Sequence, residues 1–384
     1  MGNNLLSIGV DMGNDAFKVV GPYKNELLIL NLTSPWYVRR VINEDTRYPL
    51  NLLEVEIKSK NENIGKYFVG GMAYNFNRGI IKEKTVADRH NGKTEDKNNL
   101  IVLLTSIALS LITPNKTRIK EKVVLGTMLP TEEYFKNNNE NVRIFQDKLL
   151  GVHHVKFLNP VFKGIEVEFE IAGVSVEPEG LSAINAIMYD DNGELLNEYV
   201  DNYSERTILG FDIGALTTDI TVMQNFELRT FFGMEKGTID PLNRVVDYLK
   251  TEHKVTVPRH KIDNTIIKNE KLLIYGSEIP GFKDLCSEII EFEGRQLVDE
   301  FSAKAAAAGV QLPDIGLLIF NGGGSLLFKH ILERELGRIP MIFSKDAIML
   351  NALGGWKNAN KYKSTLAENT EDSHNALQYA AITM

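Results

Sequence analysis

The stretch Ile8–Val20, with the sequence IGVDMGNDAFKVV, decides the fold that we predict, because its pattern returns later in the chain as Leu209–Val222, LGFDIGALTTDITV. Each copy holds an apolar, β-rich run, an Asp-x-Gly turn, a small or polar tip and a second apolar run. Glycine in such a turn accepts positive φ or lets a phosphate approach the backbone, and successive N–H groups there form an anion-binding concavity. The repeat predicts two hairpins, one in each half of the chain, that can bind nucleotide phosphates. Two ordinary glycine-turned hairpins are the alternative interpretation.

Carboxylates stand at the same place in both copies, as Asp11 and Asp212. They repel phosphate directly but suit Mg²⁺, which keeps much of its water and meets proteins through one or two carboxylates. Lys18 lies on the returning strand of the first copy and can neutralise a β-phosphate as a point charge. At the second tip, Thr217 and Thr218 supply hydroxyl and N–H groups. We therefore expect a Mg²⁺-nucleotide as the ligand.

Length and composition are compatible with this hypothesis and exclude some other classes of protein. A chain of 384 residues is long enough for two domains of ordinary size. Its formal net charge of −8 argues against broad direct binding to nucleic acid. The single cysteine, Cys286, excludes an internal disulfide framework and fits a reducing compartment. The longest apolar stretch, Leu100–Ile112, falls short of the roughly 20 residues that a membrane span requires, so we expect a soluble, cytoplasmic protein.

Hydrophobic periodicity predicts alternating strands and helices, the pattern of an α/β fold. The expected strands are Leu5–Val10, Ala16–Val20, Leu27–Leu32, Leu53–Ile57, Tyr67–Gly70, Val123–Pro130, Val155–Phe157, Glu166–Ile171 and Ile315–Phe320. The expected helices are Leu100–Ile112, Asp240–Lys250, Phe282–Ala308 and one that starts near Leu326. The basic run Lys116–Lys122 is interpreted as a solvated helix end or loop, and the polar run Asp190–Arg206 as a linker between the halves. For the tail, Tyr362–Met384, a packed helix and a mobile extension both remain open.

Two further segments can carry chemistry. Asn321–Ser325, NGGGS, follows a buried strand and precedes a helix, so its backbone can lie against an adenine ring or a phosphate at a helix N-terminus. A tight strand-to-helix turn is the other interpretation. The second segment is Val174–Ala183, VSVEPEGLSA. In one interpretation Glu179 has no catalytic role, and its carboxylate only stabilises the N-terminus of the following helix, by up to ~1 kcal/mol. It can instead orient a water for attack on a γ-phosphate, which suits the loose transition state of phosphoryl transfer.

These motifs occur in the order found in the superfamily of actin, sugar kinases and heat-shock chaperone ATPases. The segments that carry the resemblance are the Asp11 hairpin, Glu177–Ala183, the Asp212 hairpin, Asn321–Ser325 and Ile348–Gly354. Within the superfamily the chain most resembles the bacterial actin-like ATPases of the ParM family, which segregate plasmids, because of Leu125–Pro130 and Pro178–Gly180. The resemblance covers about residues 5 to 358.

The resemblance implies an α/β, actin-like ATPase fold. Two related lobes with ribonuclease H-like cores would enclose a nucleotide cleft and carry small inserted subdomains. The first lobe would comprise residues 1–195, with an insertion at about 31–95, and would be completed by 345–384. The second lobe would comprise residues 206–344, with an insertion at about 240–310.

The resemblance also assigns roles to single residues. Asp11 and Asp212 would hold Mg²⁺ through water, and Glu179 would polarise the attacking water, with Glu177 as its rival. Ala352 and Gly354 would lie at a hinge. The residues expected to contact ATP or GTP are Gly13, Asn14, Lys18, Gly214, Thr217, Thr218, Gly322, Gly323, Gly324 and Ser325. Asp15 departs from the small residues usual at the first tip, because it adds negative charge near phosphate.

By resemblance, such a protein would polymerise with nucleotide, hydrolyse it and depolymerise. It would reach plasmid DNA through a DNA-binding adaptor protein. Another bacterial actin-like filament and a small-molecule kinase of the same superfamily are the alternatives. We do not expect a chaperone ATPase, which would need a substrate-binding domain after the nucleotide domain, and we find no amphipathic membrane-binding segment.

Overall fold

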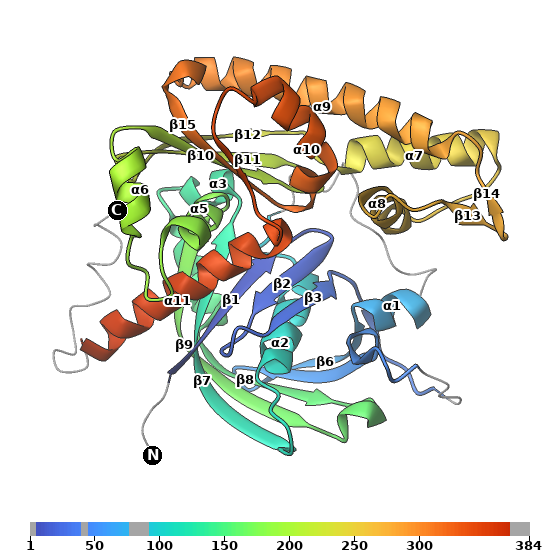
Figure 1. Cartoon of the computed structure of the whole chain (residues 1–384). Helices are drawn as coiled ribbons and strands as arrows, with labels where there is room; N and C mark the ends of the chain where they lie inside the picture. Colours follow the sequence, from blue (N-terminus) through green and yellow to red (C-terminus); the bar gives the residue numbers. More distant parts are fainter. Residues whose placement is uncertain (1–4, 40–44, 77–91, 369–384) are drawn as a thin grey trace. The chain divides into compact units, whose positions relative to one another are not determined.

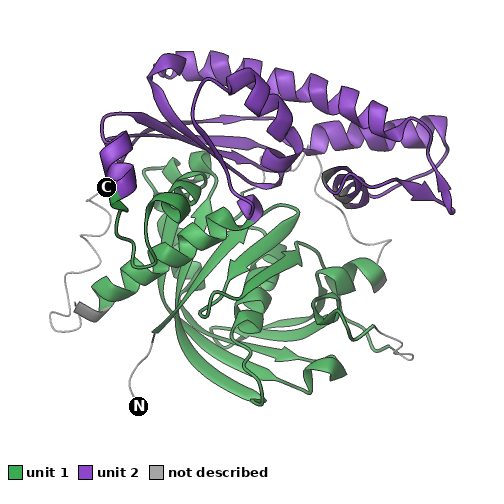
Figure 2. Ribbon diagram, in the orientation of Figure 1, with its two compact units in different colours: residues 1–84, 90–197, 349–384 green, residues 85–89, 198–348 purple. Residues whose placement is uncertain are grey.

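A computed structural model of the chain describes residues 5–39, 45–76 and 92–368. It divides the chain into two compact units (Figures 1 and 2). Unit 1 comprises residues 1–84, 90–197 and 349–384, and unit 2 comprises residues 85–89 and 198–348. The hairpin repeat therefore contributes one copy to each unit.

Unit 1 is built on a nine-stranded sheet in the order β3-β2-β1-β7-β9-β8-β5-β6-β4. Its strands are β1 (Leu5–Met12), β2 (Ala16–Val20), β3 (Glu26–Leu30), β4 (Thr33–Pro35), β5 (Leu53–Ser59), β6 (Glu62–Val69), β7 (Arg118–Leu129), β8 (Gly151–Phe157) and β9 (Glu166–Pro178). Its helices are α1 (Gly71–Phe76), α2 (Lys97–Ser110), α3 (Thr131–Phe135), α4 (Glu140–Leu149), α5 (Leu181–Met188) and α11 (Leu350–Glu368).

Unit 2 is built on a five-stranded sheet in the order β12-β11-β10-β15-β16. Its strands are β10 (Thr207–Ile213), β11 (Thr218–Gln224), β12 (Glu227–Met234), β15 (Ile315–Asn321) and β16 (Met341–Phe343), with the separate hairpin β13 (Leu273–Ile274) and β14 (Ser277–Glu278). Its helices are α6 (Asn197–Tyr203), α7 (Ile239–Glu252), α8 (Arg259–Ile267), α9 (Phe282–Ala307) and α10 (Gly323–Leu336). The helix α6 begins at the last residue of unit 1.

The two sheets share one strand order, which confirms the prediction of related halves. In unit 1, β3, β2 and β1 pair antiparallel, and β7 and β9 follow in parallel. In unit 2, β12, β11 and β10 pair antiparallel, and β15 and β16 follow in parallel. Each predicted hairpin is therefore the first pair of strands in its own sheet.

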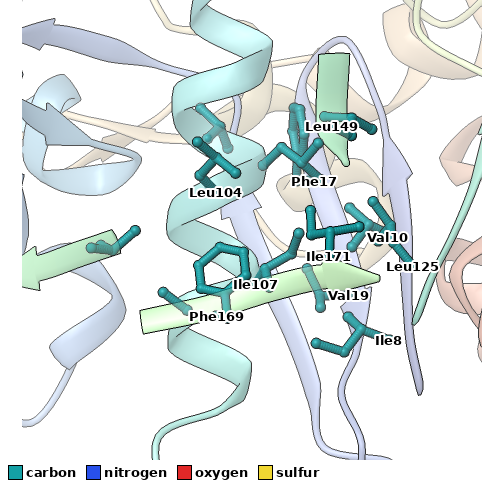
Figure 3. Packing of buried hydrophobic residues seen from close by; sticks show 14 of the residues in the cluster. Ile8, Val10, Phe17, Val19, Leu104, Ile107, Leu125, Leu149, Phe169 and Ile171 are labelled. Carbon is teal, nitrogen blue, oxygen red and sulfur yellow. The ribbon is translucent and has the colours of Figure 1, made fainter. Parts of the chain in front are cut away.

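The two faces of the unit 1 sheet carry different side chains, because successive residues of a strand point to opposite faces. On one face, Ile8 and Val10 of β1 join Leu104 and Ile107 of α2 in a hydrophobic core (Figure 3). Gly9, between them, faces α11, where a Cβ would collide with the Ala352 carbonyl. Gly126 of β7 and Gly173 of β9 also face α11. This row of glycines lets α11 lie close to the sheet.

The strict alternation predicted for Glu166–Ile171 is confirmed in β9. Val167, Phe169 and Ile171 are buried, and Glu168 and Glu170 between them reach solvent. The interpretation of the basic run 116–122 as a helix end or loop was wrong, since residues from Arg118 onward begin β7. The physical reason is complementary charge on neighbouring strands: Lys120 pairs with Glu168 at 2.7 Å, and Lys122 with Glu170 at 2.8 Å.

Two other expectations need adjustment. The polar run Asp190–Arg206 is not a plain linker, because residues 197–203 form α6 and Tyr189 makes an isolated bridge with Leu195. The helix α11 continues to Glu368, so the first part of the polar tail is helical, and the remainder lies outside the described residues. Residues 40–44 and 77–91 of the insertion expected at about 31–95 also lie outside the described residues. Of the helices that the structure describes, none combines the length and apolar character needed to cross a membrane.

Candidate functional site

The first hairpin places a carboxylate and an ammonium side by side. In the antiparallel register of β1 and β2, Asp11 lies directly opposite Lys18. The Lys18 Nζ is 3.1 Å from the Asp11 Oδ2, and Asp11 is only 6% exposed. A buried carboxylate requires such a counter-charge. Lys18 therefore supplies a counter-charge to Asp11 at the end of a buried strand.

The turn of the first hairpin is tightly packed around Gly13. A Cβ at Gly13 would lie 2.6 Å from the Lys18 Nζ and would also meet the Ala16 carbonyl. The Lys18 ammonium thus lies over the turn because residue 13 has no side chain. Asn14 is half-buried and Asp15 is exposed. The structure brings Gly13, Asn14, Lys18 and Asp11 together, as the sequence predicted.

The second hairpin has the same register with a different partner. Asp212 lies opposite Asp219 across β10 and β11, the position that Lys18 holds in the first hairpin. Asp212 is 8% exposed and Asp219 is 5% exposed. The Thr217 hydroxyl donates to the Asp219 Oδ2 at 3.3 Å, and the Gly214 N–H donates to the Thr217 carbonyl at 2.9 Å. Two buried carboxylates therefore belong to one hairpin.

The segment Lys236–Thr238 supports this second turn, and the sequence reasoning missed it. The Thr218 hydroxyl donates to the Lys236 carbonyl at 2.8 Å, and the Thr238 N–H donates to the Gly214 carbonyl at 3.1 Å. The Thr218 hydroxyl is thus used by the protein, whereas the Thr217 hydroxyl is closer to the tip. Gly237-Thr238 directly before a helical pattern is a helix-start signal that could have indicated this segment.

The glycine-rich segment after β15 packs against the end of β10. Asn321 lies opposite Asp212 in the parallel register of these strands. Gly322 has φ of 77°, and a Cβ there would lie 2.7 Å from the Asp212 Oδ1. The Ser325 hydroxyl donates to the Gly322 carbonyl at 2.7 Å. Around Gly323, in contrast, a Cβ would meet nothing within 4 Å. Gly322 therefore lies beside Asp212, Gly324 packs against Ile213, and Gly323 at the start of α10 has open space.

The two candidate acids of the β9–α5 connection have different surroundings. Glu177 accepts hydrogen bonds from the Ser182 hydroxyl at 2.6 Å and from the Asn185 amide at 2.8 Å. Its burial raises the pKa of the Glu177 carboxyl, and these hydrogen bonds act in the opposite direction. Glu177 is thus held by α5, which makes it a poor candidate to orient a water.

Glu179 lies on the turn itself, between β9 and α5. It is 6% exposed, and its carboxylate forms an ion pair with Lys93. Its N–H donates to the Leu129 carbonyl at 2.8 Å, and Gly180 follows with φ of 82°. Gly180 is the N-cap residue of α5, and no side chain caps that end. The capping interpretation of Glu179 thus has no support in the geometry.

The residues expected at a hinge lie in α11 of unit 1. Ala352 packs against Gly9 of β1, and a Cβ at Gly354 would collide with the Ser182 carbonyl of α5. These contacts show close packing of α11 on the sheet and on α5. The hinge role of Ala352 and Gly354 stays a prediction.

The acidic residues fit a cation held mostly by water. Within the described residues, no group of three or more His, Cys, Asp or Glu side chains is arranged to hold a metal ion. Each hairpin instead offers its own carboxylate, Asp11 or Asp212, and the second adds Asp219. Mg²⁺ suits such a sparse oxygen donor set.

The chain is similar to one known protein family over part of its length and to several solved structures over most of it. Residues 9–181 match the family model described as the N-terminal domain of actin-like proteins. No curated protein matches the chain. Among solved structures, the actin-like protein Alp7A has a TM-score of 0.73 at 15% identity, covering 96% of this chain and 99% of its own.

Two ParM structures are also similar. A ParM from Bacillus thuringiensis solved with ADP has a TM-score of 0.70 at 17% identity, covering 94% of this chain and 99% of its own. A non-polymerisable quadruple mutant of pCBH ParM has a TM-score of 0.70 at 18% identity, covering 93% of this chain and 100% of its own.

These matches confirm the fold that the sequence predicted. The shared strand order of the two sheets and the Asp-x-Gly hairpins agree with them. The chain has the actin-like ATPase fold seen in the Alp7A and ParM structures, and residues 9–181 match the model of the actin-like N-terminal domain.

Proposed function

We propose that the chain is an ATPase that polymerises into nucleotide-dependent filaments, and that these filaments segregate plasmid DNA through a DNA-binding adaptor. The observation that carries the proposal is the repeated hairpin, with a buried aspartate at the same register position in both units of an actin-like fold. The ADP-bound B. thuringiensis ParM supports nucleotide binding. The description of the pCBH ParM mutant as non-polymerisable supports filament formation.

In this proposal, different residues contact different parts of a bound nucleoside triphosphate. The turn at Gly13 and Asn14 and the turn at Gly214 to Thr217 would bind phosphate oxygens through backbone N–H groups that the hairpins do not use themselves, since the Gly214 N–H already donates to the Thr217 carbonyl. Lys18 adds positive charge at the first turn. Gly322–Ser325, at the start of α10, would contact the adenosine, with room for it around Gly323.

The hydrolytic step is assigned to Glu179. Its carboxylate would accept a hydrogen bond from the attacking water and orient it toward the γ-phosphate. Asp11 and Asp212 would hold Mg²⁺ through water, and the bound ion would neutralise charge on the phosphates. ATP is the proposed substrate, with GTP as the alternative that the assay below also measures.

Whether filaments grow or disassemble would depend on whether the bound nucleotide still has its γ-phosphate. A contact between different faces of identical subunits, repeated without closing, generates an open helical filament. Bound triphosphate would favour the polymerising conformation, and loss of the γ-phosphate would weaken this preference. The net charge of −8 disfavours direct contact with DNA, which supports an adaptor with basic character.

The proposed compartment is the cytoplasm. Cys286 is buried in unit 2, and burial raises the pKa of its thiol to about 12. Such a thiol is inert and agrees with a reducing environment.

Sedimentation combined with phosphate release tests the proposal. The wild type should pellet with Mg²⁺ and ATP and release phosphate, and GTP is measured in parallel. Glu179→Gln should also pellet but release phosphate about 100-fold more slowly, because the water is no longer oriented. Glu168→Gln, at the surface of the preceding strand β9, is the control and should behave as wild type. A wild type that stays in the supernatant and phosphorylates a sugar would point to a small-molecule kinase instead.

The adaptor is tested by adding DNA to the same assay. Filaments alone should leave plasmid DNA in the supernatant, and DNA should pellet only when a basic protein encoded with this chain is also present. Direct pelleting of DNA by the filament at physiological salt would reject the adaptor part of the proposal.

A further inference from the structure

We propose that Lys93 is a positioning residue for Glu179, and that a buried chain of side chains through Asn99 and Asn31 couples Lys93 to the turn at Gly13. The inference rests on the proposed function, because it names a further residue for the proposed hydrolytic step. All of the residues concerned lie in unit 1.

The first observation is the ion pair itself. Lys93 is 8% exposed and its ammonium bonds to the Glu179 carboxylate, which is 6% exposed. Ion pairs on a protein surface are common and contribute little to stability. An ion pair in which both side chains are buried costs free energy unless its geometry is good. A buried carboxylate without a counter-charge is disfavoured in its charged form. Lys93 therefore supplies a counter-charge to the Glu179 carboxylate and restricts its direction.

The second observation is how the backbone around Lys93 is held. The Glu133 carboxylate, at the start of α3, accepts hydrogen bonds from the Lys93 N–H at 3.1 Å and from the Thr94 hydroxyl at 3.0 Å. The Lys148 ammonium of α4 donates to the Thr94 carbonyl. This segment has no regular secondary structure of its own, so these side chains fix its position. The position of the Lys93 ammonium is set by them.

The third observation connects Lys93 to the phosphate-binding turn. The Asn99 amide donates to the Lys93 carbonyl at 2.9 Å. The Asn31 amide donates both to the Asn99 Oδ1 at 3.0 Å and to the Gly13 carbonyl at 3.2 Å. Asn31 and Asn99 are buried. Hydrogen bonds therefore connect the Gly13 turn to the Lys93 backbone, and the Lys93 side chain connects that backbone to the Glu179 carboxylate.

This arrangement has a functional consequence. The Asn31 amide N–H group and the Asn99 side chain are paired in this network, and breaking one of these buried hydrogen bonds would leave a donor or acceptor unpaired at a cost of about 1–3 kcal/mol. A shift of the Gly13 turn on phosphate binding would be passed to the Lys93 backbone and so to Glu179. The network thus positions the residue that orients water with respect to the turn that binds phosphate.

The test compares turnover with binding in Lys93→Met, which keeps the length of the side chain and removes its charge. We expect kcat of ATP hydrolysis to fall about 10- to 100-fold, as for misplaced catalytic groups. We expect the Kd for ADP to stay within about threefold of wild type, because Lys93 does not contact nucleotide in this proposal. Lys97→Met is the control, since Lys97 is an exposed lysine of the same region and should change neither quantity.

A double-mutant cycle separates positioning from a structural role. In the Glu179→Gln background, Lys93→Met should lower kcat no further, because both changes remove the same function. Unchanged kcat in Lys93→Met, or an equal further loss in the Glu179→Gln background, would overturn the proposal. Absence of ATPase activity in the wild type would instead reject the proposed function, so the two failures are distinguishable.

A second pair of variants is measured whether or not Lys93→Met folds, as judged by its circular dichroism melting curve. Asn99→Leu removes the amide that holds the Lys93 carbonyl at nearly constant volume. It should lower kcat with little change in the Kd for ADP. Asn98→Leu, on the exposed neighbouring residue, should leave kcat unchanged. Equal kcat values for Asn99→Leu and wild type would contradict the coupling to the Gly13 turn.

Discussion

The two hairpins share a register and differ in the residue opposite the aspartate. Lys18 faces Asp11 in unit 1, and Asp219 faces Asp212 in unit 2. The first hairpin therefore carries its own cation, 3.1 Å from the carboxylate, and the second carries two buried carboxylates. The comparison shows an ammonium beside the aspartate of the first hairpin and a second carboxylate at the same register position of the other hairpin.

The hairpins also differ in what surrounds the turn. The first turn is crowded by its own hairpin, through the Ala16 carbonyl and the Lys18 ammonium near Gly13. The second turn is supported from outside, by backbone contacts from the segment before α7. A shared Asp-x-Gly pattern thus tolerates two different ways of holding the turn.

The largest expected effect is on ADP affinity, when the residue opposite the aspartate is replaced. Lys18→Met should weaken ADP binding about 10- to 100-fold, because a charge-assisted contact to phosphate is worth about 1.5–3 kcal/mol. Asp219→Asn, the matching change in the second hairpin, should cost less than about threefold at saturating Mg²⁺, since the ion already offsets the charge of the carboxylates. Isothermal titration calorimetry measures both. Equal losses in the two variants would break the distinction between the hairpins.

The next effect concerns the two glycines. Gly13→Ala should destabilise the protein by about 1–3 kcal/mol, because the new methyl group overlaps the Lys18 ammonium and the Ala16 carbonyl. Gly214→Ala should cost clearly less, since its Cβ would meet only the Thr217 carbonyl, at 3.2 Å. Chemical denaturation followed by circular dichroism compares them. Greater destabilisation by Gly214→Ala would show that the crowding of the first turn has been misjudged.

The smallest effect probes the outside support of the second turn. Thr218→Val removes the hydroxyl that donates to the Lys236 carbonyl and should cost about 1 kcal/mol of unfolding free energy. Thr218→Ser keeps the hydroxyl and serves as the control. Phe17 occupies this register position in the first hairpin, where a hydroxyl bond of this kind has no counterpart. If Thr218→Val and Thr218→Ser melt together, the support does not come from this hydrogen bond.

The sequence predicted the parts of the fold that depend on local pattern. The repeated Asp-x-Gly stretch located both hairpins, and the alternation in Glu166–Ile171 located β9, because one face of that strand is buried. The same reasoning failed for the start of β7, where Lys120 and Lys122 are stabilised by glutamates of the neighbouring strand. Charge pairing between strands depends on their register, which a single segment does not reveal.

The candidate site was predictable to the same extent. Asp11 and Lys18 could be placed together because a hairpin makes them neighbours in space. The partner of Glu179 could not, since Lys93 is distant in sequence and lies in a polar stretch without periodicity. Glu177 and Glu179 looked equivalent in the sequence, and only the contacts from Ser182 and Asn185 separate them.

The central proposal is that binding of a Mg²⁺-nucleotide depends on the aspartate of each hairpin, Asp11 and Asp212. Calorimetric titration of ADP with Mg²⁺ into the wild type, Asp11→Asn and Asp212→Asn tests it most directly. The wild type should bind one ADP per chain, and each variant alone should lose at least about tenfold in affinity. Wild-type affinity in either variant, or no binding by the wild type, would contradict the claim.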